Sequence, residues 1–262
     1  MDFGIKGQGA VVAAASKGLG RACAVALAAE GVNLAVFARD LDALNETAAA
    51  AQAQGVKAIA IQADVTRPDQ IRQVIDRAVD ELGRLDIVVC NAGGPPPGTF
   101  ASVNDEQWEQ AFQLNLMSVV RLTHAALPHM RRQGGGRIIN LVSTSVREPI
   151  EGLILSNSIR SGVIGLAKTL SQELGPDNIT VNNIITGSIM TDRQRSLRER
   201  TAQQLGISVE EAIKRVEKNI PLGRLGEPEE LAALVAFLAS RQAAYITGAS
   251  IPVDGGIMKG IW

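Results

Sequence analysis

Seven short apolar runs, each followed by a longer segment, dominate the 262-residue sequence. The runs are almost continuously hydrophobic, which is typical of parallel strands that are buried on both faces. Alternation of strands with helical segments favours right-handed crossovers and a sheet with helices on both faces. The sequence therefore predicts one α/β domain over residues 1–262, a doubly wound parallel sheet of about seven strands. The predicted strands cover residues 9–15, 32–38, 56–62, 85–90, 137–143, 179–185 and 249–254.

One helical segment carries a clear apolar stripe. Its members recur at steps of four, three, four and four residues, which is the spacing of one helix face. We expect this face to pack against the sheet. The stripe consists of Ile159, Val163, Leu166, Leu170 and Leu174.

Two regions interrupt the alternation. GGPPPG, residues 93–98, directly follows the fourth predicted strand, and its three prolines favour a stiff, extended loop. The loop leaves the carboxyl end of a strand, where sheets of this kind bind ligands. Residues 193–219 are highly charged and predict two short helices around LGIS. They are either a solvated surface or a lid over a substrate.

The overall charge and the apolar segments exclude several classes of function. The net charge is −1, which gives no broad field for nucleic acid or an anionic membrane. No apolar run approaches the roughly 20 residues that span a bilayer. The first ten residues lack the pattern of a secretory signal, so we expect a cytoplasmic protein. Cys23 and Cys90 lie in a predicted helix and a predicted strand, and we interpret them as thiols of the core.

The turn after the first predicted strand contains two closely spaced glycines. VVAAASKGLGRA runs from the strand into a helix, so backbone N–H groups at the helix start can face a pyrophosphate. The turn resembles the T-G-x-x-x-G-x-G fingerprint of the short-chain dehydrogenase/reductase family. Alanine replaces the first glycine of that fingerprint, and its methyl group should crowd the turn. The matching cofactor-binding positions are Ala14, Ser16, Lys17, Gly18, Leu19 and Gly20.

Further segments match the same family in the correct order over nearly the whole chain, and the likeness is closest to a divergent subgroup that resembles 3-oxoacyl-[acyl-carrier-protein] reductase. The resemblance implies a Rossmann-like fold, a nicotinamide dinucleotide and a small carbonyl or alcohol substrate. It assigns cofactor contacts to Asp64, Val65, Asn91, Ala92, Gly93, Gly187, Ile189 and Thr191. It also places Asn115 and Ser143 at two catalytic positions.

The end of the second predicted strand indicates which dinucleotide is bound. An NAD-preferring site would place an acid there for the ribose 2′-hydroxyl, but this chain has Ala38 followed by Arg39. Arg39 and Lys17 would attract a 2′-phosphate. Asp40 could partly neutralise Arg39, but we interpret it as the start of the next helix. We therefore predict NADP(H), the alternative being that both cations are ordinary surface charges.

The family's catalytic Tyr-x-x-x-Lys is missing. In the family, the tyrosine protonates the alkoxide, and the lysine lowers the phenol pKa and holds the nicotinamide ribose. The alignment places Ser156 and Arg160 there, with Ser156 at the usual 13 residues after Ser143. An alkyl alcohol is a far poorer acid than a phenol, and arginine keeps its charge near neutrality. We predict a catalytic set of Asn115, Ser143, Ser156 and Arg160, with water as a candidate proton source.

Other candidate donors are few. The chain's single tyrosine, Tyr245, lies far along the sequence. Glu148 and Glu151 flank the loop before Ser156 and are weaker candidates. His124 and His129 lie on a predicted helix that we expect to be remote from the cleft.

Three hypotheses follow from these features. The first is an NADP(H)-dependent oxidoreductase with a rebuilt proton-transfer site. The second is a catalytically weak or inactive NADP(H)-binding sensor or scaffold. The third is a lyase or isomerase that holds the dinucleotide as a structural group. The resemblance also implies a homotetramer with interfaces on helices near residues 104–133 and 156–175 and on the last strand. The apolar C-terminal GGIMKGIW supports that assembly only weakly.

Overall fold

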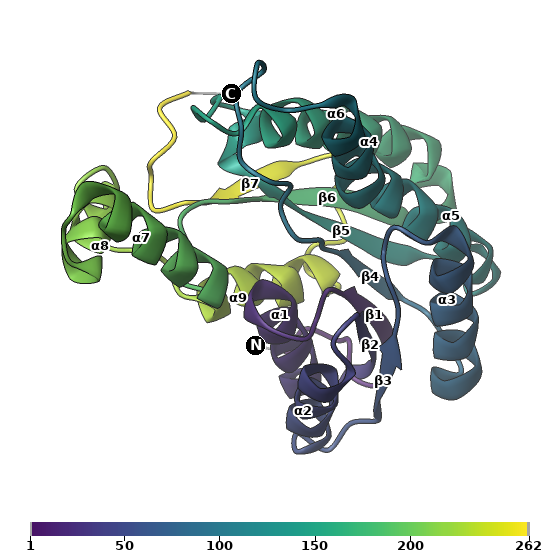
Figure 1. Cartoon of the computed structure of the whole chain (residues 1–262). Helices are drawn as coiled ribbons and strands as arrows, with labels where there is room; N and C mark the ends of the chain where they lie inside the picture. Colours follow the sequence, from purple (N-terminus) through teal and green to yellow (C-terminus); the bar gives the residue numbers. More distant parts are fainter. Residues whose placement is uncertain (1, 261–262) are drawn as a thin grey trace.

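A seven-stranded parallel sheet organises the chain in the computed structural model, which describes residues 2–260 (Figure 1). Its strand order, β3-β2-β1-β4-β5-β6-β7, confirms the predicted α/β doubly wound architecture. The strands are β1 Gly9–Ala13, β2 Asn33–Ala38, β3 Ala58–Gln62, β4 Ile87–Cys90, β5 Gly136–Ser143, β6 Ile179–Thr186 and β7 Ser250–Val253. Ile261 and Trp262, the last residues of the apolar C-terminal segment, lie outside the described residues.

Helices cover both faces of the sheet, as the alternation predicts. One face is packed by α1, α2 and α9, and the other by α3, α5 and α6. The helices are α1 Gly18–Ala29, α2 Leu41–Gln52, α3 Pro68–Leu82, α4 Asp105–Phe112, α5 Ser118–Arg132, α6 Ile154–Glu173, α7 Asp192–Leu205, α8 Val209–Glu217 and α9 Pro228–Ala239. A π-helical turn, Gln113–Met117, joins α4 to α5, and a 3-10 turn, Thr144–Val146, follows β5.

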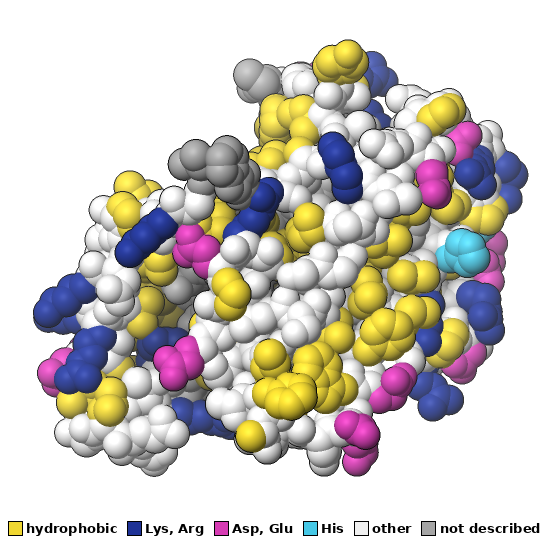
Figure 2. All heavy atoms as spheres, turned by 90° about the horizontal axis from the view of Figure 1, so that it is seen from above, with side chains coloured by type: hydrophobic (Ala, Val, Ile, Leu, Met, Phe, Trp, Pro, Cys, Tyr) yellow, Lys and Arg dark blue, Asp and Glu magenta, His cyan; other side chains and the backbone are white. Residues whose placement is uncertain are grey.

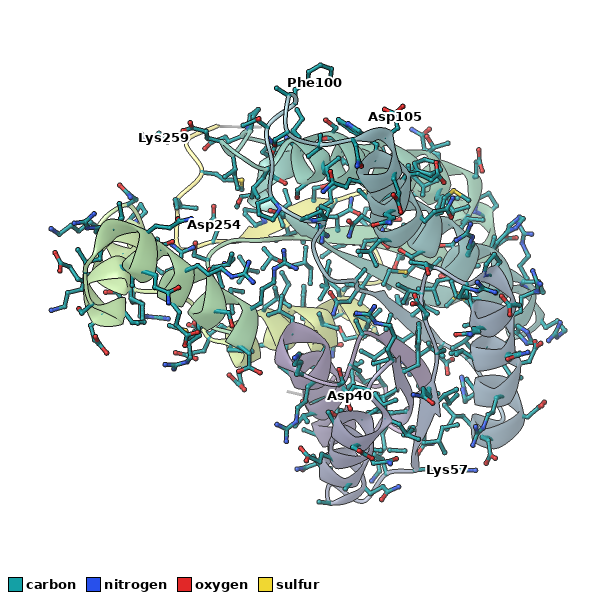
Figure 3. All side chains as sticks on the ribbon, in the orientation of Figure 1. Asp40, Lys57, Phe100, Asp105, Asp254 and Lys259 are labelled. Atoms are coloured by element: carbon teal, nitrogen blue, oxygen red, sulfur yellow. The ribbon has the colours of Figure 1, made fainter. Side chains whose placement is uncertain are left out.

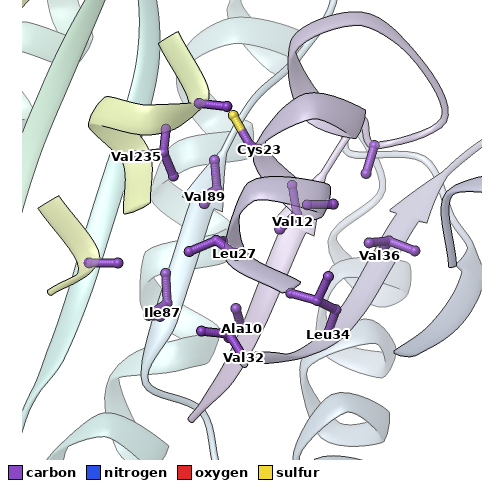
Figure 4. Close-up of a cluster of buried hydrophobic side chains, with 14 of the residues drawn as sticks. Ala10, Val12, Cys23, Leu27, Val32, Leu34, Val36, Ile87, Val89 and Val235 are labelled. Carbon is purple, nitrogen blue, oxygen red and sulfur yellow. The ribbon is translucent and has the colours of Figure 1, made fainter. Parts of the chain in front are cut away.

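The hydrophobic core forms two layers, one on each side of the sheet. Figure 4 shows part of one layer, where Cys23 and Leu27 of α1 lie among strand side chains and Val235 of α9. Burial raises the pKa of the Cys23 thiol to about 12, and it does the same for Cys90. Both sulfurs therefore stay protonated, which agrees with their interpretation as core thiols. No helix in residues 2–260 combines the length and the apolar character of a membrane span.

The apolar stripe of α6 packs into the core. Val163 and Leu174 are buried, and Leu166 and Leu170 are half-buried against the same core cluster. The buried face of α6 also carries two polar residues of the predicted site, Ser156 and Arg160.

Helices α7 and α8 correspond to the charged segment and follow β6 directly. In Figure 1 they project to one side of the sheet, beyond the carboxyl ends of β6 and β7. Ser208 begins α8 by accepting a hydrogen bond from the Glu211 backbone N–H at 3.1 Å. We call residues 193–219 the lid segment.

Candidate active site

The predicted site residues gather at one edge of the sheet. Because all strands are parallel, the segments after β1, β2, β3, β4, β5 and β6 leave at the same edge. These six segments contain Ala14–Gly20, Arg39, Asp64–Val65, Asn91–Gly93, Ser143 and Gly187–Thr191. The topology thus brings together every cofactor-binding position that the sequence predicts.

The turn after β1 is strained at Ala14, the alanine that replaces the first glycine of the fingerprint. Ala14 has φ +49°, in the left-handed region that favours glycine. The turn is held nonetheless, because the Ala15 N–H donates to Phe37 O at 3.2 Å and the Thr47 hydroxyl donates to Ala15 O at 2.9 Å. The surrounding structure therefore imposes the backbone geometry that the first glycine of the fingerprint would relax.

The start of α1 fits a bound pyrophosphate. A Cβ on Gly20 would lie 2.3 Å from Ala14 O, so only glycine lets the helix pack this closely on the turn. Lys17 precedes the helix without capping it, and the first turn of α1 contains no acid. Its N-terminal backbone N–H groups are thus left for an external anion. Thr191 lies across from this turn, in contact range of a Cβ placed on Gly18.

Asp40 begins the helix after β2, as predicted. The Asp40 carboxylate accepts a hydrogen bond from the Ala43 N–H at 3.2 Å, which makes Asp40 the N-cap of α2. Lys17 and Arg39 are exposed, and within residues 2–260 neither forms an ion pair. The Gln62 side-chain amide donates to Arg39 O at 2.8 Å and so fixes the backbone at this strand end.

The loops after β3 and β6 are rigidly held. Asp64 accepts hydrogen bonds from the N–H and the hydroxyl of Thr66, both at 2.8 Å. Val65 and Ile189 are buried and belong to the two core clusters, which anchors both loops on the sheet. A Cβ on Gly187 would lie 2.5 Å from Asp254 Cα, so the ends of β6 and β7 approach closely there.

Asn115 and Arg160 meet at one carbonyl oxygen. Asn115, in the π-helical turn, donates from Nδ2 to Gly93 O at 2.9 Å, and Arg160 donates to the same oxygen at 3.4 Å. The Oδ1 atom of Asn115 is buried and has no hydrogen-bond partner among residues 2–260. Gly93 belongs to the predicted cofactor loop, so hydrogen bonds connect the predicted catalytic and cofactor-binding sets.

Arg160 is a buried cation. Its side chain is 9% exposed, and its second hydrogen bond goes to Leu141 O at 3.3 Å. Loss of hydration on burial, together with the nearby charge of Arg193, lowers the pKa of Arg160 to about 10. The guanidinium therefore remains charged near neutrality, as the sequence predicts.

Three serines lie close together where the end of β5 and the turn after it meet α6. Ser156 Oγ lies 3.0 Å from Ser145 Oγ, and both residues are buried. Ser143 Oγ accepts a hydrogen bond from the Ser145 N–H at 3.2 Å. Ser145 was not predicted from the sequence. The feature of the sequence that could have identified it is its position two residues after Ser143, in the short turn that follows β5.

The remaining candidate donors lie elsewhere or are engaged. Glu148 Oε1 accepts hydrogen bonds from the backbone N–H groups of Lys259 and Gly260, so it anchors the C-terminal tail. Tyr245 is fully exposed and precedes β7, at the sheet edge opposite the site. His124 is exposed on α5, as expected for a residue remote from the cleft.

The loop with three prolines joins the site to the lid segment. Gly98 N–H donates to Gly152 O at 2.6 Å, and Ile154 N–H donates to Gly98 O at 3.2 Å, so the loop holds the start of α6. From α7, Arg193 donates to Gly94 O at 3.1 Å and to Pro95 O at 3.4 Å. The sequence gives Arg193 no distinction from its charged neighbours, so its contact with the loop was not predicted.

Comparison with known proteins places this geometry in a family. Residues 13–258 match the family model described as Enoyl-(Acyl carrier protein) reductase. The chain is 36% identical over 251 residues to the 3-oxoacyl-[acyl-carrier-protein] reductase FabG of Staphylococcus epidermidis, covering 95% of this chain and 98% of the relative. It is also 36% identical over 247 residues to the short-chain reductase protein NovJ of Streptomyces niveus, covering 94% and 92%.

Solved structures agree over the whole chain. The L-sorbose reductase of Gluconobacter frateurii, complexed with NADPH and L-sorbose, matches with a TM-score of 0.96 and 33% identity over 100% of both chains. A 7α-hydroxysteroid dehydrogenase complexed with NADH matches with a TM-score of 0.90 and 28% identity, covering 100% and 98%. Both nicotinamide dinucleotides thus occur among similar proteins. By fold and by sequence, the chain belongs to the short-chain dehydrogenase/reductase family of NAD(P)H-dependent oxidoreductases.

Proposed function

We propose that this protein is an NADP(H)-dependent reductase of a small carbonyl compound, 3-oxoacyl-like or another ketone, and that it works without a tyrosine proton donor. The meeting of Asn115 and Arg160 at Gly93 O carries the proposal. This contact joins the predicted cofactor loop to two catalytic candidates and keeps the charge of Arg160 beside that loop.

The site residues divide the chemistry among them. Bound NADPH would supply the hydride. The Ser143 hydroxyl is placed to donate a hydrogen bond to the substrate carbonyl, and the fixed charge of Arg160 would stabilise the alkoxide that forms. Arg160 cannot release a proton near neutrality, so the hydrogen-bonded hydroxyls of Ser145 and Ser156 would orient a water that protonates the alkoxide. Loss of a dedicated general acid typically costs 10²–10⁴-fold in rate.

The preference for NADP(H) is part of the proposal. It is supported by two exposed cations, Lys17 and Arg39, at the strand end where a 2′-phosphate would lie. It is supported further by Asp40, whose carboxylate caps α2 rather than pairing with Arg39. The same proposal includes a single domain, in which residues 193–219 act as a lid over the substrate. It also includes assembly into a homotetramer and a cytoplasmic location.

A catalytically inactive NADP(H) sensor is the second candidate. It is favoured by the strained Ala14 in the nucleotide turn and by the absence of a phenol at the site. The two candidates share the bound dinucleotide and differ in turnover.

Calorimetric titration with NADPH and NADH, followed by NADPH consumption with 3-oxoacyl thioesters, ketones and quinones, tests the proposal. We expect tighter binding of NADPH and slow but measurable turnover. Tight binding without turnover on the whole panel would support the sensor. Equal or reversed affinity for NADH would contradict the cofactor assignment, and no binding of either dinucleotide would overturn both candidates.

A further inference from the structure

Two arginines contact the loop after β4 without a carboxylate partner among the described residues. Arg160 reaches this loop from α6 and Arg193 from α7, and they donate to the neighbouring carbonyl oxygens of Gly93 and Gly94. The pKa of Arg160 is lowered first by burial and then by the positive charge of Arg193. Two neighbouring cations without an anion repel each other, so this position favours a negatively charged ligand.

Two acids of the surrounding loops bind backbone N–H groups rather than an arginine. Asp254 accepts hydrogen bonds from the N–H groups of Gly256 and Met258, and Glu148 accepts those of Lys259 and Gly260. Figure 3 shows Asp254 between the sheet and the lid helices, and Lys259 in the tail segment beyond it. Within residues 2–260, no ion pair joins Arg160 or Arg193 to a carboxylate.

Arg193 differs from the other cations of the lid segment. Lysine and arginine side chains gather at the left of the face seen in Figure 2, on the side where α7 and α8 lie in Figure 1. Most such charges are simply solvated, but Arg193 reaches across to a loop that is 99 residues away in sequence. The side chain is exposed overall, yet partial loss of hydration lowers the pKa of its guanidinium. Its only hydrogen-bond partners in the described chain are two carbonyl oxygens, at 3.1 and 3.4 Å.

We propose that Arg193, next to the charge of Arg160, binds a carboxylate carried by the substrate, so that the enzyme acts on oxo acids in preference to neutral ketones. A guanidinium matches a carboxylate with two parallel hydrogen bonds, and such charge-assisted bonds are stronger than those to neutral carbonyls. A carboxylate would thus displace the contacts to Gly94 and Pro95. The inference rests on the proposed carbonyl reduction, and it makes Arg193 a residue that determines substrate specificity.

The position of Arg193 favours the substrate over the pyrophosphate as its partner. Arg193 contacts the loop after β4, one residue beyond the oxygen shared by Asn115 and Arg160. Because β4 pairs with β1 and Thr191 faces the nucleotide turn, a phosphate of the dinucleotide is the alternative partner that the experiment has to separate. An anion held there would lie beside the catalytic groups. The two sources of negative charge are separable by experiment.

The test measures binding rather than turnover. Protein saturated with NADP⁺, which cannot reduce a ketone, is titrated calorimetrically with 3-oxobutanoate and with its neutral methyl ester. We expect the acid to bind at least about tenfold more tightly, with a preference that weakens at high salt. Arg193→Gln should abolish the preference and leave NADP⁺ affinity unchanged, while Arg193→Lys should keep part of it. Arg195→Gln, on the same helix and exposed, is the matched control and should behave like the wild type.

Two results would overturn the inference. Equal affinity of the wild type for acid and ester would remove the anion site. A loss of NADP⁺ affinity in Arg193→Gln, with the acid preference intact, would assign Arg193 to the dinucleotide instead. If the protein bound no dinucleotide, the proposed function would fail separately, and the same acid and ester titration of the free protein would still decide whether the anion site exists.

Discussion

The Ser156 hydroxyl lies 3.0 Å from the Ser145 hydroxyl, and both residues are buried. Each hydroxyl is therefore satisfied by the other, and removal of one leaves a buried polar group without its partner. In the proposed function, this pair stands in place of a phenol, which would be bulkier and far more acidic.

Ser145→Ala should destabilise the protein by about 1–2 kcal/mol, because Ser156 loses its hydrogen bond. The double variant Ser145→Ala/Ser156→Ala should recover most of that loss, since no unsatisfied hydroxyl remains. Urea denaturation of the two single variants and the double variant measures the coupling. Ser161→Ala serves as control, because its hydroxyl is exposed and bonds only to Asn157 O of its own helix. Additive losses would show that the pair is not coupled.

A phenol placed at the site should restore fast proton transfer. Ser156→Tyr combined with Arg160→Lys rebuilds the family's donor, and we expect turnover on the best ketone to rise by about 10²-fold or more. Arg160→Lys alone should give no such gain, because it adds no acid. NADPH consumption, with calorimetric proof that the variants still bind the dinucleotide, is the measurement. A folded, dinucleotide-binding double variant with unchanged rate would mean that another group already supplies the proton.

Strain at Ala14 should be relieved by glycine. Ala14 has φ +49°, a conformation that costs an alanine roughly 1 kcal/mol relative to glycine. Ala14→Gly should therefore raise the midpoint of thermal unfolding and should not weaken dinucleotide binding. Ala13→Gly is the matched control, because Ala13 is a buried residue of β1 and its replacement should lower stability. A lower midpoint for Ala14→Gly would show that the turn tolerates the methyl group without strain.

Much of this site follows from the pattern of the sequence. The seven strands, the charged helical pair and the cap at Asp40 are local features, and local spacing predicts them. The strain at Ala14 follows from its own methyl group in a turn where the family's fingerprint has glycine. These features depend on neighbours in the sequence, which a single sequence displays directly.

Contacts between distant segments could not be predicted in the same way. Arg193 and Gly94 are 99 residues apart, and only the packing of the lid segment brings them together. Ser145 and Ser156 meet because the turn after β5 packs against α6. The burial of Arg160 belongs to the same group, because its hydrogen bonds go to Gly93 O and Leu141 O, which lie 67 and 19 residues away in the sequence.

Arg160→Met should stabilise the free protein, because burial of its charge is costly and only two long hydrogen bonds at 3.3 and 3.4 Å offset it. Burial lowers the pKa of Arg160 to about 10 in the folded state, below that of the unfolded chain. The unfolded state therefore binds the proton more tightly, and the folded state bears the full penalty at every pH below 10. The gain in Arg160→Met should be roughly 1–3 kcal/mol and independent of pH between 6 and 9.

Above pH 10 the folded wild type can release the proton, so the penalty shrinks and the two proteins should converge in stability. Denaturation at a series of pH values measures this, with Arg147→Met, an exposed arginine, as the control that should show no gain. NADPH should stabilise the wild type more than Arg160→Met, because the variant lacks the cation beside the cofactor loop. An Arg160→Met protein less stable than the wild type at pH 7 would show that the contacts to Gly93 and Leu141 outweigh the cost of the buried charge.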